Sequence, residues 1–310
     1  MNSWWQETFP KGRQVLPIRD ALEREVLISY GEIGSGQPLV LLHGIGSWSF
    51  NWRHNINALA PHFRVICVDA KGYGFSQTAS PPEIPGHQIL ELSRVIEALS
   101  DQPVVLAAES LGALTALAGV QTYPSLIERL ILINVPIFPK KLPSWGMQAL
   151  AYLPLFLVQG IEQTQTLPAF APLIRSLTRW VRQEVVFDPT QITDAEIEAL
   201  IYPYLHHPGT LSQFVVDLQL AAQEIAKHQR RQPNFLSTIQ QNLAQVICPT
   251  LILWSDCDRW FPVQDGKTLH DYLPHAEFKV IPNCGHIATS GNPKIVNAAI
   301  LEFLGRPFGE

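Results

Sequence analysis

Continuous runs of Val, Ile and Leu recur along this chain of 310 residues, and helix-like segments separate most of them. Because the runs do not alternate with polar residues, they are typical of strands that are buried on both faces of a parallel sheet. The expected strands are 38–42, 64–69, 103–108, 128–134, 249–254 and 276–281, and the expected crossover helices are 52–60, 87–99, 111–121, 263–273 and 293–304. The pattern predicts an α/β fold with a mostly parallel central sheet, helices on both faces, and an antiparallel edge hairpin at 13–20 and 24–33.

The regular alternation stops after Asn134. Residues 138–244 contain no strand-like run, but they contain several helical stretches with abundant proline. A chain of this length exceeds the ~250–300 residues at which a single core stops growing, so an insertion is expected. We therefore predict a core formed by residues 1–137 and 245–310, with a helical cap or lid at 138–244.

Composition narrows the class of function. A net charge of −5 provides no basic field for nucleic acid, so we expect no nucleic-acid partner. Residues 1–7 lack the positive start and the apolar stretch of a signal peptide, which predicts a cytoplasmic protein. The four cysteines, Cys67, Cys248, Cys257 and Cys284, show no Cys-x-x-Cys spacing, so reduced thiols are expected, although Cys257 and Cys284 could lie near each other. No metal site is expected at the adjacent pair His206 and His207, whose side chains point in different directions, and no glycine-rich motif implies an organic cofactor.

Ser110 stands between a strand and a helix in the manner of a nucleophile. Residues 104–112 read Val-Val-Leu-Ala-Ala-Glu-Ser-Leu-Gly, which approximates Gly-x-Ser-x-Gly with Ala108 in place of the first glycine. A sharp strand-to-helix turn lifts the serine hydroxyl clear of the sheet, and only small side chains two residues to either side let the backbone pass so closely. The neighbouring Glu109 is interpreted mainly as a spacer.

An acid and a base follow Ser110 in the chain, each after an apolar strand run. The acid is predicted to be Asp258 and the base His286; Asp256 is the alternative acid. The order serine, acid, histidine belongs to one hydrolase architecture and differs from that of other serine hydrolases. Upstream, the strand 38–42 runs into the glycine turn 43–46, which can aim a backbone N–H at the same pocket. His43 at this strand end is interpreted as a packed structural residue.

Taken together, these landmarks resemble the α/β-hydrolase family, in its subgroup with a helical cap, over roughly residues 25–305. The resemblance rests on His43-Gly44, on Asp69 to Ser76, on the elbow at Ser110, on Asp258 and on Gly285-His286. It implies a Ser110, His286 and Asp258 triad, with an oxyanion hole formed by the backbone N–H groups of Ile45 and Leu111. The chain looks most like a group that includes epoxide hydrolases, haloalkane dehalogenases, carbon–carbon bond hydrolases and pheophytinase-like esterases. Epoxide hydrolases and dehalogenases need an aspartate nucleophile, which the serine at position 110 does not supply.

We therefore expect a serine hydrolase that cleaves a carboxylic ester of a small hydrophobic substrate through an acyl-enzyme. His286 takes the proton of Ser110 and returns it to the leaving group, while Asp258 holds the imidazole in the correct tautomer. Two alternatives stay open: a carbon–carbon bond hydrolase of the same fold, and a non-catalytic small-molecule receptor built on it. The sequence does not indicate an oligomeric state.

The first part of the expected cap is unusually apolar, because residues 142–161 contain no charge. Its prolines and glycines favour an apolar lid over a membrane span. Farther on, Arg175, Arg179 and Arg182 share one helical face, and Ile174, Leu177 and Val181 share another. Such a helix either contacts an anionic membrane surface peripherally or is a solvated cap helix with its apolar side inward. Four aromatic residues are expected to border the site as packing or substrate contacts: Trp48, Phe50, Trp52 and Trp260.

Overall fold

The fold was examined in a computed structural model that describes residues 2–78 and 83–305. The predicted core ranges also include residues 1, 79–82 and 306–310, which lie outside the described residues. The described chain contains an eight-stranded sheet in the order β1-β2-β4-β3-β5-β6-β7-β8. Its strands are β1 (Gln14–Arg19), β2 (Glu25–Ile33), β3 (Pro38–Leu42), β4 (Arg64–Val68), β5 (Val104–Glu109), β6 (Ile127–Ile133), β7 (Thr250–Ser255) and β8 (Ala276–Ile281).

All neighbouring strands from β4 to β8 in the sheet order run parallel, whereas β1 and β2 form an antiparallel hairpin that pairs with β4 at one edge. The prediction of a mostly parallel sheet with an edge hairpin is therefore confirmed. Every residue of β3, β5 and β7 is buried, which explains why these strands read as continuous apolar runs.

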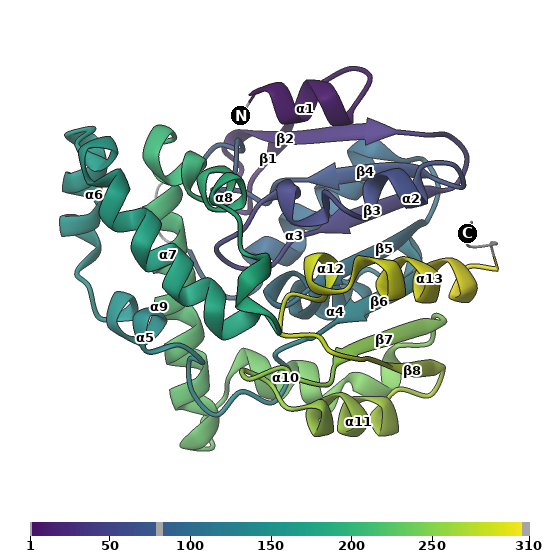
Figure 1. The fold of residues 1–310 in the computed structure, drawn as a ribbon. Coiled ribbons are helices and arrows are strands. Elements are labelled where there is room, and N and C mark those ends of the chain that lie inside the picture. The colour runs from purple at the N-terminus through teal and green to yellow at the C-terminus, as the bar shows by residue number, and fades with distance from the viewer. Residues whose placement is uncertain (1, 79–82, 306–310) are drawn as a thin grey trace.

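Helices cover both faces of the sheet, because alternate strand residues point to opposite sides (Figure 1). Apolar side chains of α3 (His87–Leu99), α4 (Leu111–Thr122), α10 (Phe235–Gln241) and α11 (Val263–Tyr272) pack on one face. Those of α1 (Asn2–Thr8), α2 (Ile56–Leu59), α12 (Ala288–Gly291) and α13 (Pro293–Phe303) pack on the other. The prediction of helices on both faces is confirmed.

The helix expected at 52–60 is wrong in detail. The segment forms a short 3-10 helix, η1 (Ser49–Trp52), and then the single turn α2. Asn51 donates a hydrogen bond to Glu109 at 2.6 Å, and Asn55 donates one to Asn297 at 2.7 Å. These tertiary contacts, together with the low helix propensity of asparagine, explain why the segment does not continue as one helix.

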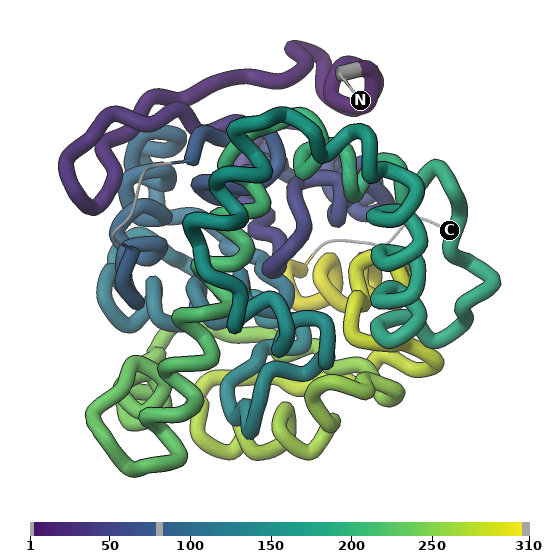
Figure 2. The backbone as a smooth tube through the Cα atoms, turned by 90° about the vertical axis from the view of Figure 1, so that its left-hand side faces the viewer, coloured from purple at the N-terminus to yellow at the C-terminus, as the bar shows by residue number. Residues whose placement is uncertain are grey.

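Between β6 and β7 the described chain contains helices and no strand. The main ones are α5 (Trp145–Ala151), α6 (Leu155–Gln163), α7 (Ala171–Val185), α8 (Asp194–His206) and α9 (Thr210–Gln229), and we refer to these five as the inserted helices. Between the same two strands, short 3-10 turns occur at η3 (Leu167–Phe170), η4 (Pro189–Gln191) and η5 (Leu243–Gln245), whereas η2 (Pro124–Leu126) precedes β6. The inserted helices lie together beyond one end of the sheet, and Figure 2 shows α5, α6 and α7 nearest the viewer.

Candidate active site

Ser110 lies at the junction of β5 and α4 with a strained backbone, φ 56° and ψ −127°. A positive φ is costly for a residue with a side chain, and it persists here because the neighbouring backbone is packed closely. A Cβ atom on Gly112 would run into the carbonyl oxygen of His43, and one on Gly44 would come within 2.9 Å of the Ser110 Cβ. Small residues at these positions therefore bring the glycine turn after β3 against the serine.

His286 joins Ser110 to Asp258. Its Nε2 lies 2.9 Å from the Ser110 Oγ, and its Nδ1 lies 2.7 Å from the Asp258 Oδ2. The side chains of His286 and Asp258 are fully buried. The other oxygen of Asp258 accepts hydrogen bonds from the N–H groups of Trp260 and Phe261 at 2.8 and 3.0 Å. The structure thus brings together the three side chains that the sequence places in one site.

Asp256, the alternative acid, is turned elsewhere. It accepts hydrogen bonds from the N–H groups of Cys284 and Asn283, both at 3.1 Å. Although partial burial opposes it, these hydrogen bonds lower the pKa of Asp256. Asp256 holds the loop before His286, and Asp258 is the carboxylate that contacts the imidazole.

Asn134, at the end of β6, fixes the other side of this loop. It is fully buried with φ 46°, and its amide donates hydrogen bonds to the His286 carbonyl at 2.6 Å and to the Ser255 hydroxyl at 3.0 Å. Its oxygen accepts a hydrogen bond from the Ser255 N–H at 2.8 Å. This role of Asn134 was not predicted from the sequence, although an asparagine that directly follows a buried strand was a visible signal.

Glu109 is more than a spacer beside Ser110. Its buried carboxylate accepts hydrogen bonds from the Thr289 N–H at 3.0 Å, the Thr289 hydroxyl at 2.9 Å and the Asn51 amide at 2.6 Å. Burial raises the pKa of Glu109, although these hydrogen bonds and the nearby His286 act in the opposite direction. Glu109 therefore ties the end of β5, directly before Ser110, to the segment that follows His286.

The glycine turn after β3 borders Ser110 on its other side. Ile45 and Leu111, whose N–H groups are the predicted oxyanion donors, both line the cavity beside Ser110. His43 is buried; its Nδ1 lies 2.8 Å from the Gly44 carbonyl, and its Nε2 accepts a hydrogen bond from the Ala70 N–H at 3.0 Å. Burial lowers the pKa of His43 to about 4, despite its contact with the Gly44 carbonyl. His43 is thus a neutral residue that shapes the turn.

A cavity with about 1090 Å³ of empty space, counting its open mouth, lies between Ser110 and the inserted helices. Its wall is mostly apolar and is formed by residues including Ile45, Leu111, Leu114, Leu142, Met147, Leu218, Ala221, Phe235, Trp260 and Phe261. Of the four aromatic residues expected at the site, only Trp260 lines this cavity. Trp48 and Trp52 are instead fully buried in the core, with Phe50 packed against that cluster. The rings of Trp48 and Phe50 contact Trp4 of α1. For Trp48, Phe50 and Trp52 the packing alternative therefore holds, and none of the three lines the cavity.

One polar cluster interrupts the apolar wall. Asp217 of α9 accepts hydrogen bonds from the Tyr73 hydroxyl at 2.7 Å and from the amides of Gln88 and Gln213, each at 3.0 Å. Burial raises the pKa of Asp217 to about 6, although the three hydrogen bonds lower it. The cluster joins an inserted helix to the core beside the glycine turn.

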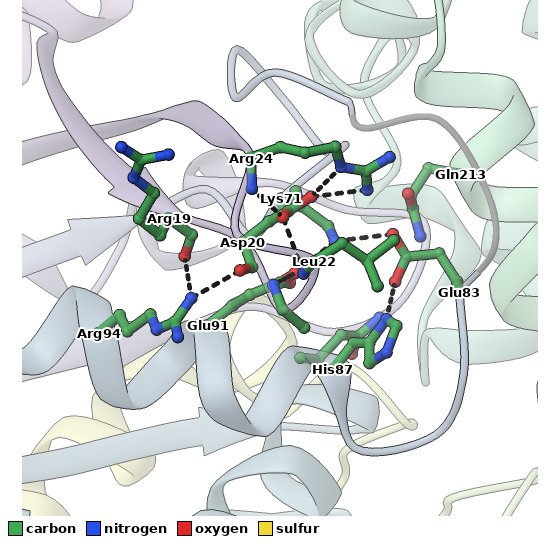
Figure 3. Close-up of polar contacts among 12 residues, drawn as sticks. Arg19, Asp20, Leu22, Arg24, Lys71, Glu83, His87, Glu91, Arg94 and Gln213 are labelled. Atoms are coloured by element: carbon green, nitrogen blue, oxygen red, sulfur yellow. Dashed lines mark hydrogen bonds and ion pairs between the residues drawn. The ribbon is translucent and has the colours of Figure 1, made fainter.

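Ion pairs hold Glu83 at the edge of the cavity (Figure 3). The buried ammonium of Lys71 pairs with Glu83 at 2.7 Å and with Glu91, and Glu83 also contacts His87 at 3.1 Å. Although burial opposes it, the two carboxylates raise the pKa of Lys71. Asp20 of the edge hairpin, bound to Arg24 at 2.8 Å, lies beside this group. The carboxylate of Glu83 is therefore neutralised within the protein.

The remaining sequence predictions concern thiols, metals and membranes. The four cysteines are free, and the Cys257 N–H donates a hydrogen bond to the Cys284 carbonyl at 3.0 Å, so these two residues do lie near each other. Over residues 2–78 and 83–305, no group of His, Cys, Asp or Glu side chains is arranged to hold a metal, and His206 instead packs against Tyr202. No helix in this part of the chain is long and apolar enough to cross a membrane.

Comparisons with known proteins agree on one family. A family model described as alpha/beta hydrolase fold matches residues 37–293. A 2-hydroxy-6-oxononadienedioate/2-hydroxy-6-oxononatrienedioate hydrolase of Paraburkholderia phymatum is 26% identical over 295 residues, which cover 91% of this chain and 92% of that protein. Bifunctional epoxide hydrolase 2 of Sus scrofa is 26% identical over 298 residues, which cover 90% of this chain and 53% of that protein.

Among solved structures, a meta-cleavage product hydrolase from Pseudomonas fluorescens is similar with a TM-score of 0.72 and 21% identity. The match covers 94% of this chain and 97% of that one. At this level of identity the likeness supports the shared fold alone.

Proposed function

Within the α/β-hydrolase fold family, to which this chain belongs, we propose that it is a serine hydrolase that cleaves carboxylic esters of hydrophobic compounds. The observation that carries the proposal is the position of His286, within hydrogen-bond distance of both Ser110 and Asp258. A serine hydroxyl is a weak nucleophile unless an adjacent base accepts its proton, and this geometry supplies such a base.

In the proposed reaction, Ser110 Oγ attacks the ester carbonyl while His286 Nε2 takes its proton. The imidazolium then protonates the departing alcohol, and water releases the acid from the acyl-enzyme by the same route. Asp258 stabilises the imidazolium through its contact with Nδ1. The N–H groups of Ile45 and Leu111 are proposed to stabilise the oxyanion, a contribution worth about 3 kcal/mol per donor in related chemistry.

The cavity supports an uncharged, apolar substrate. Lys141 is the one cationic residue that lines it among the described residues, whereas Glu83, Asp217 and Glu224 supply carboxylates. Lys141 is exposed at the edge of the cavity, and the carboxylates are bound by other protein groups. A dianionic substrate would enter with little compensation for its lost hydration, which is costly for a charge. The inserted helices are proposed to act as a cap that covers the acyl or alcohol group.

A second candidate is hydrolysis of a carbon–carbon bond, and the names of the relatives favour it over ester cleavage. The Paraburkholderia phymatum relative is named for the hydrolysis of a dienedioate, and its similarity spans nearly the whole chain. Carbon–carbon hydrolases of this family also use a serine, so the Ser110 geometry is compatible with both reactions. The cavity wall contains three carboxylates and one lysine among the described residues, and this scarcity of cationic groups is the observation that favours ester cleavage.

The two reactions are separated by direct assays on the full chain. A panel of nitrophenyl esters from acetate to long-chain acids tests ester cleavage, and the absorbance of 2-hydroxy-6-oxononadienedioate tests carbon–carbon cleavage. We expect ester turnover that Ser110→Ala lowers by about 10⁴-fold or more, with the variant melting at the same temperature as the wild type. Turnover of the dienedioate without any ester turnover would establish the second candidate.

The receptor alternative is tested by labelling. An activated Ser110 reacts covalently with a fluorophosphonate: His286 takes its proton as Oγ attacks the phosphorus, and the P–F bond breaks with release of fluoride. We expect stoichiometric labelling of the wild type and none of Ser110→Ala. A wild type that stays unlabelled but still binds an apolar ester tightly would identify a receptor instead of an enzyme.

A further inference from the structure

An apolar face covers the outer side of helices α5, α6 and α7. More than half of the exposed large apolar side chains of the described residues fall within residues 145–187. We define the outer apolar face by ten of them: Trp145, Tyr152, Leu153, Phe156, Leu157, Ile161, Phe170, Leu173, Leu177 and Trp180. Tyr152 and Phe156 are 87% and 70% exposed. A concentration of this kind on one side of a protein marks an interaction surface, because scattered single residues are the usual pattern.

The three helices form one continuous side of the molecule. Figures 1 and 2 both place α5, α6 and α7 together at the side farthest from the sheet. The rings of Trp145 and Trp180 lie 5.1 Å apart, which connects α5 to α7. On α6, Val158 and Glu162 are buried while Phe156, Leu157 and Ile161 point outward.

The outer apolar face lacks charge over an unusual length of chain. Between Lys141 and Arg175 the sequence contains a single charged residue, Glu162. Its carboxylate is buried and accepts hydrogen bonds from the N–H groups of Gly209 and Leu211 at 3.0 and 2.8 Å. Entry of these side chains into an apolar phase therefore buries no exposed charge from this segment.

Helix α7 is oriented differently from either expectation. Arg175, Arg179 and Arg182 pair with Glu198, Asp194 and Glu196 of α8, so the arginine face is turned toward the protein. Leu173 and Leu177 are 58% and 51% exposed. The carboxylates of α8 thus pair with the predicted basic face, whereas the predicted apolar face is divided: Leu177 is exposed, and Ile174 packs against the buried cluster of Ile192, Ile197 and Ile201.

We propose that the outer apolar face inserts into the interfacial region of a phospholipid bilayer. Amphipathic helices that lie in a membrane surface bury an apolar side of this kind, and Trp and Tyr prefer the headgroup level. Lys140 and Lys141, directly before the uncharged stretch, are exposed, and we expect their charges to add attraction to anionic lipid. The inference rests on the surface of the inserted helices and does not require the proposed ester hydrolysis.

The relation of this face to the cavity favours a lipid surface over a second copy of the chain. Leu142, Pro143 and Met147 line the cavity, whereas Trp145, in the same segment, is 61% exposed. The segment that borders the substrate cavity thus also forms part of the outer apolar face. A bilayer at this position dissolves apolar esters next to the cavity, whereas a second copy would cover the same segment with protein.

The proposal is tested by flotation of the Ser110→Ala chain with vesicles of phosphatidylcholine, alone and mixed with phosphatidylglycerol. Using this variant separates binding from turnover, so the result does not depend on the esterase proposal. We expect flotation with both vesicles and more with phosphatidylglycerol. Adding Phe156→Ser and Leu157→Ser should lower the partition coefficient by about tenfold or more, because two apolar side chains no longer insert.

The matched control adds Ile247→Ser and Tyr272→Ser, which are 70% and 57% exposed but lie outside the inserted helices. This control should float like the parent chain. Fold is checked by thermal melting of all variants. Absence of flotation of the parent chain, or equal flotation of both double variants, overturns the proposal. A dimer by light scattering that Phe156→Ser and Leu157→Ser dissociate, without flotation, would assign the face to a second copy.

Discussion

The hydroxyl of Tyr73 donates a hydrogen bond to Asp217 across 2.7 Å and so joins the loop after β4 to helix α9. The ring of Tyr73 also packs edge-on against His43, at the start of the glycine turn beside Ser110, with ring centroids 5.6 Å apart. A buried carboxylate on an inserted helix is thereby connected to the turn that carries a proposed oxyanion donor. We therefore expect a change in the charge of Asp217 to affect both helix α9 and the glycine turn beside Ser110.

Replacing Asp217 by asparagine should change how stability depends on pH. Burial raises the pKa of Asp217 from 3.8 to about 6, so over that interval the folded protein holds a proton that the unfolded chain releases. The contribution of this group is fully present below the lower value and is lost as the pH rises through the higher one. We expect the free energy of unfolding of Asp217→Asn, relative to wild type, to increase by on the order of 1–3 kcal/mol across this window. Urea denaturation at a series of pH values measures it, and a constant difference would contradict the prediction.

Two glycines of α4, the helix that begins after Ser110, provide a matched test of its contact with the glycine turn. A Cβ atom on Gly112 would collide with the His43 carbonyl, so Gly112→Ala should lower the free energy of unfolding by about 1–3 kcal/mol and lower ester turnover. On Gly119 the nearest atom would be a methyl carbon of Leu92 at 3.6 Å, an ordinary contact. Gly119→Ala should therefore stabilise the protein by about 0.5–1 kcal/mol. Denaturation and activity measurements on both variants check the pair, and equal effects would refute the role given to Gly112.

The strands were predictable because burial on both faces leaves a direct trace in the sequence. Strand β3 was predicted with its observed bounds, Pro38–Leu42, and all five of its residues are buried. Segment 52–60 was not predictable in the same way, because hydrogen bonds from Asn51 and Asn55 to distant residues determine its local shape. Local periodicity contains no information about such partners. The helix α1 was likewise not anticipated; its Trp5 is buried against the core.

The residues of the candidate site also divide into those that could be predicted from the sequence and those that could not. Ser110, Asp258 and His286 could be proposed together because their order and their positions after strands are sequence properties. The supporting contacts of Asn134 and Glu109 depend on which strand ends lie side by side, and that becomes visible only in three dimensions.

The two neighbouring acids after β7 should have very different effects on catalysis. Asp258→Asn keeps the shape of the side chain but removes the charge that orients and stabilises His286, so kcat should fall by about 10³–10⁴-fold. Asp256→Asn weakens the hydrogen bonds that the side chain accepts from the N–H groups of Asn283 and Cys284 but leaves the contact of Asp258 with His286, so kcat should change by less than about tenfold while stability falls by about 1 kcal/mol. Steady-state kinetics with one nitrophenyl ester compare the variants. A larger loss of kcat in Asp256→Asn than in Asp258→Asn would show that Asp256, and not Asp258, is the acid that supports His286.

The cavity wall predicts where chain-length preference can be altered. Ala221 of α9 lines the cavity, so a phenylalanine there should occupy space that a long acyl chain uses. Gln223, two residues farther along α9, is exposed, and Gln223→Phe adds the same side chain outside the cavity. We expect Ala221→Phe to lower kcat/KM for a nitrophenyl octanoate by about tenfold or more relative to the acetate, whereas Gln223→Phe leaves the ratio unchanged. An unchanged ratio in Ala221→Phe, with the variant folded and active on the acetate, would mean that the acyl chain binds on another side of Ser110.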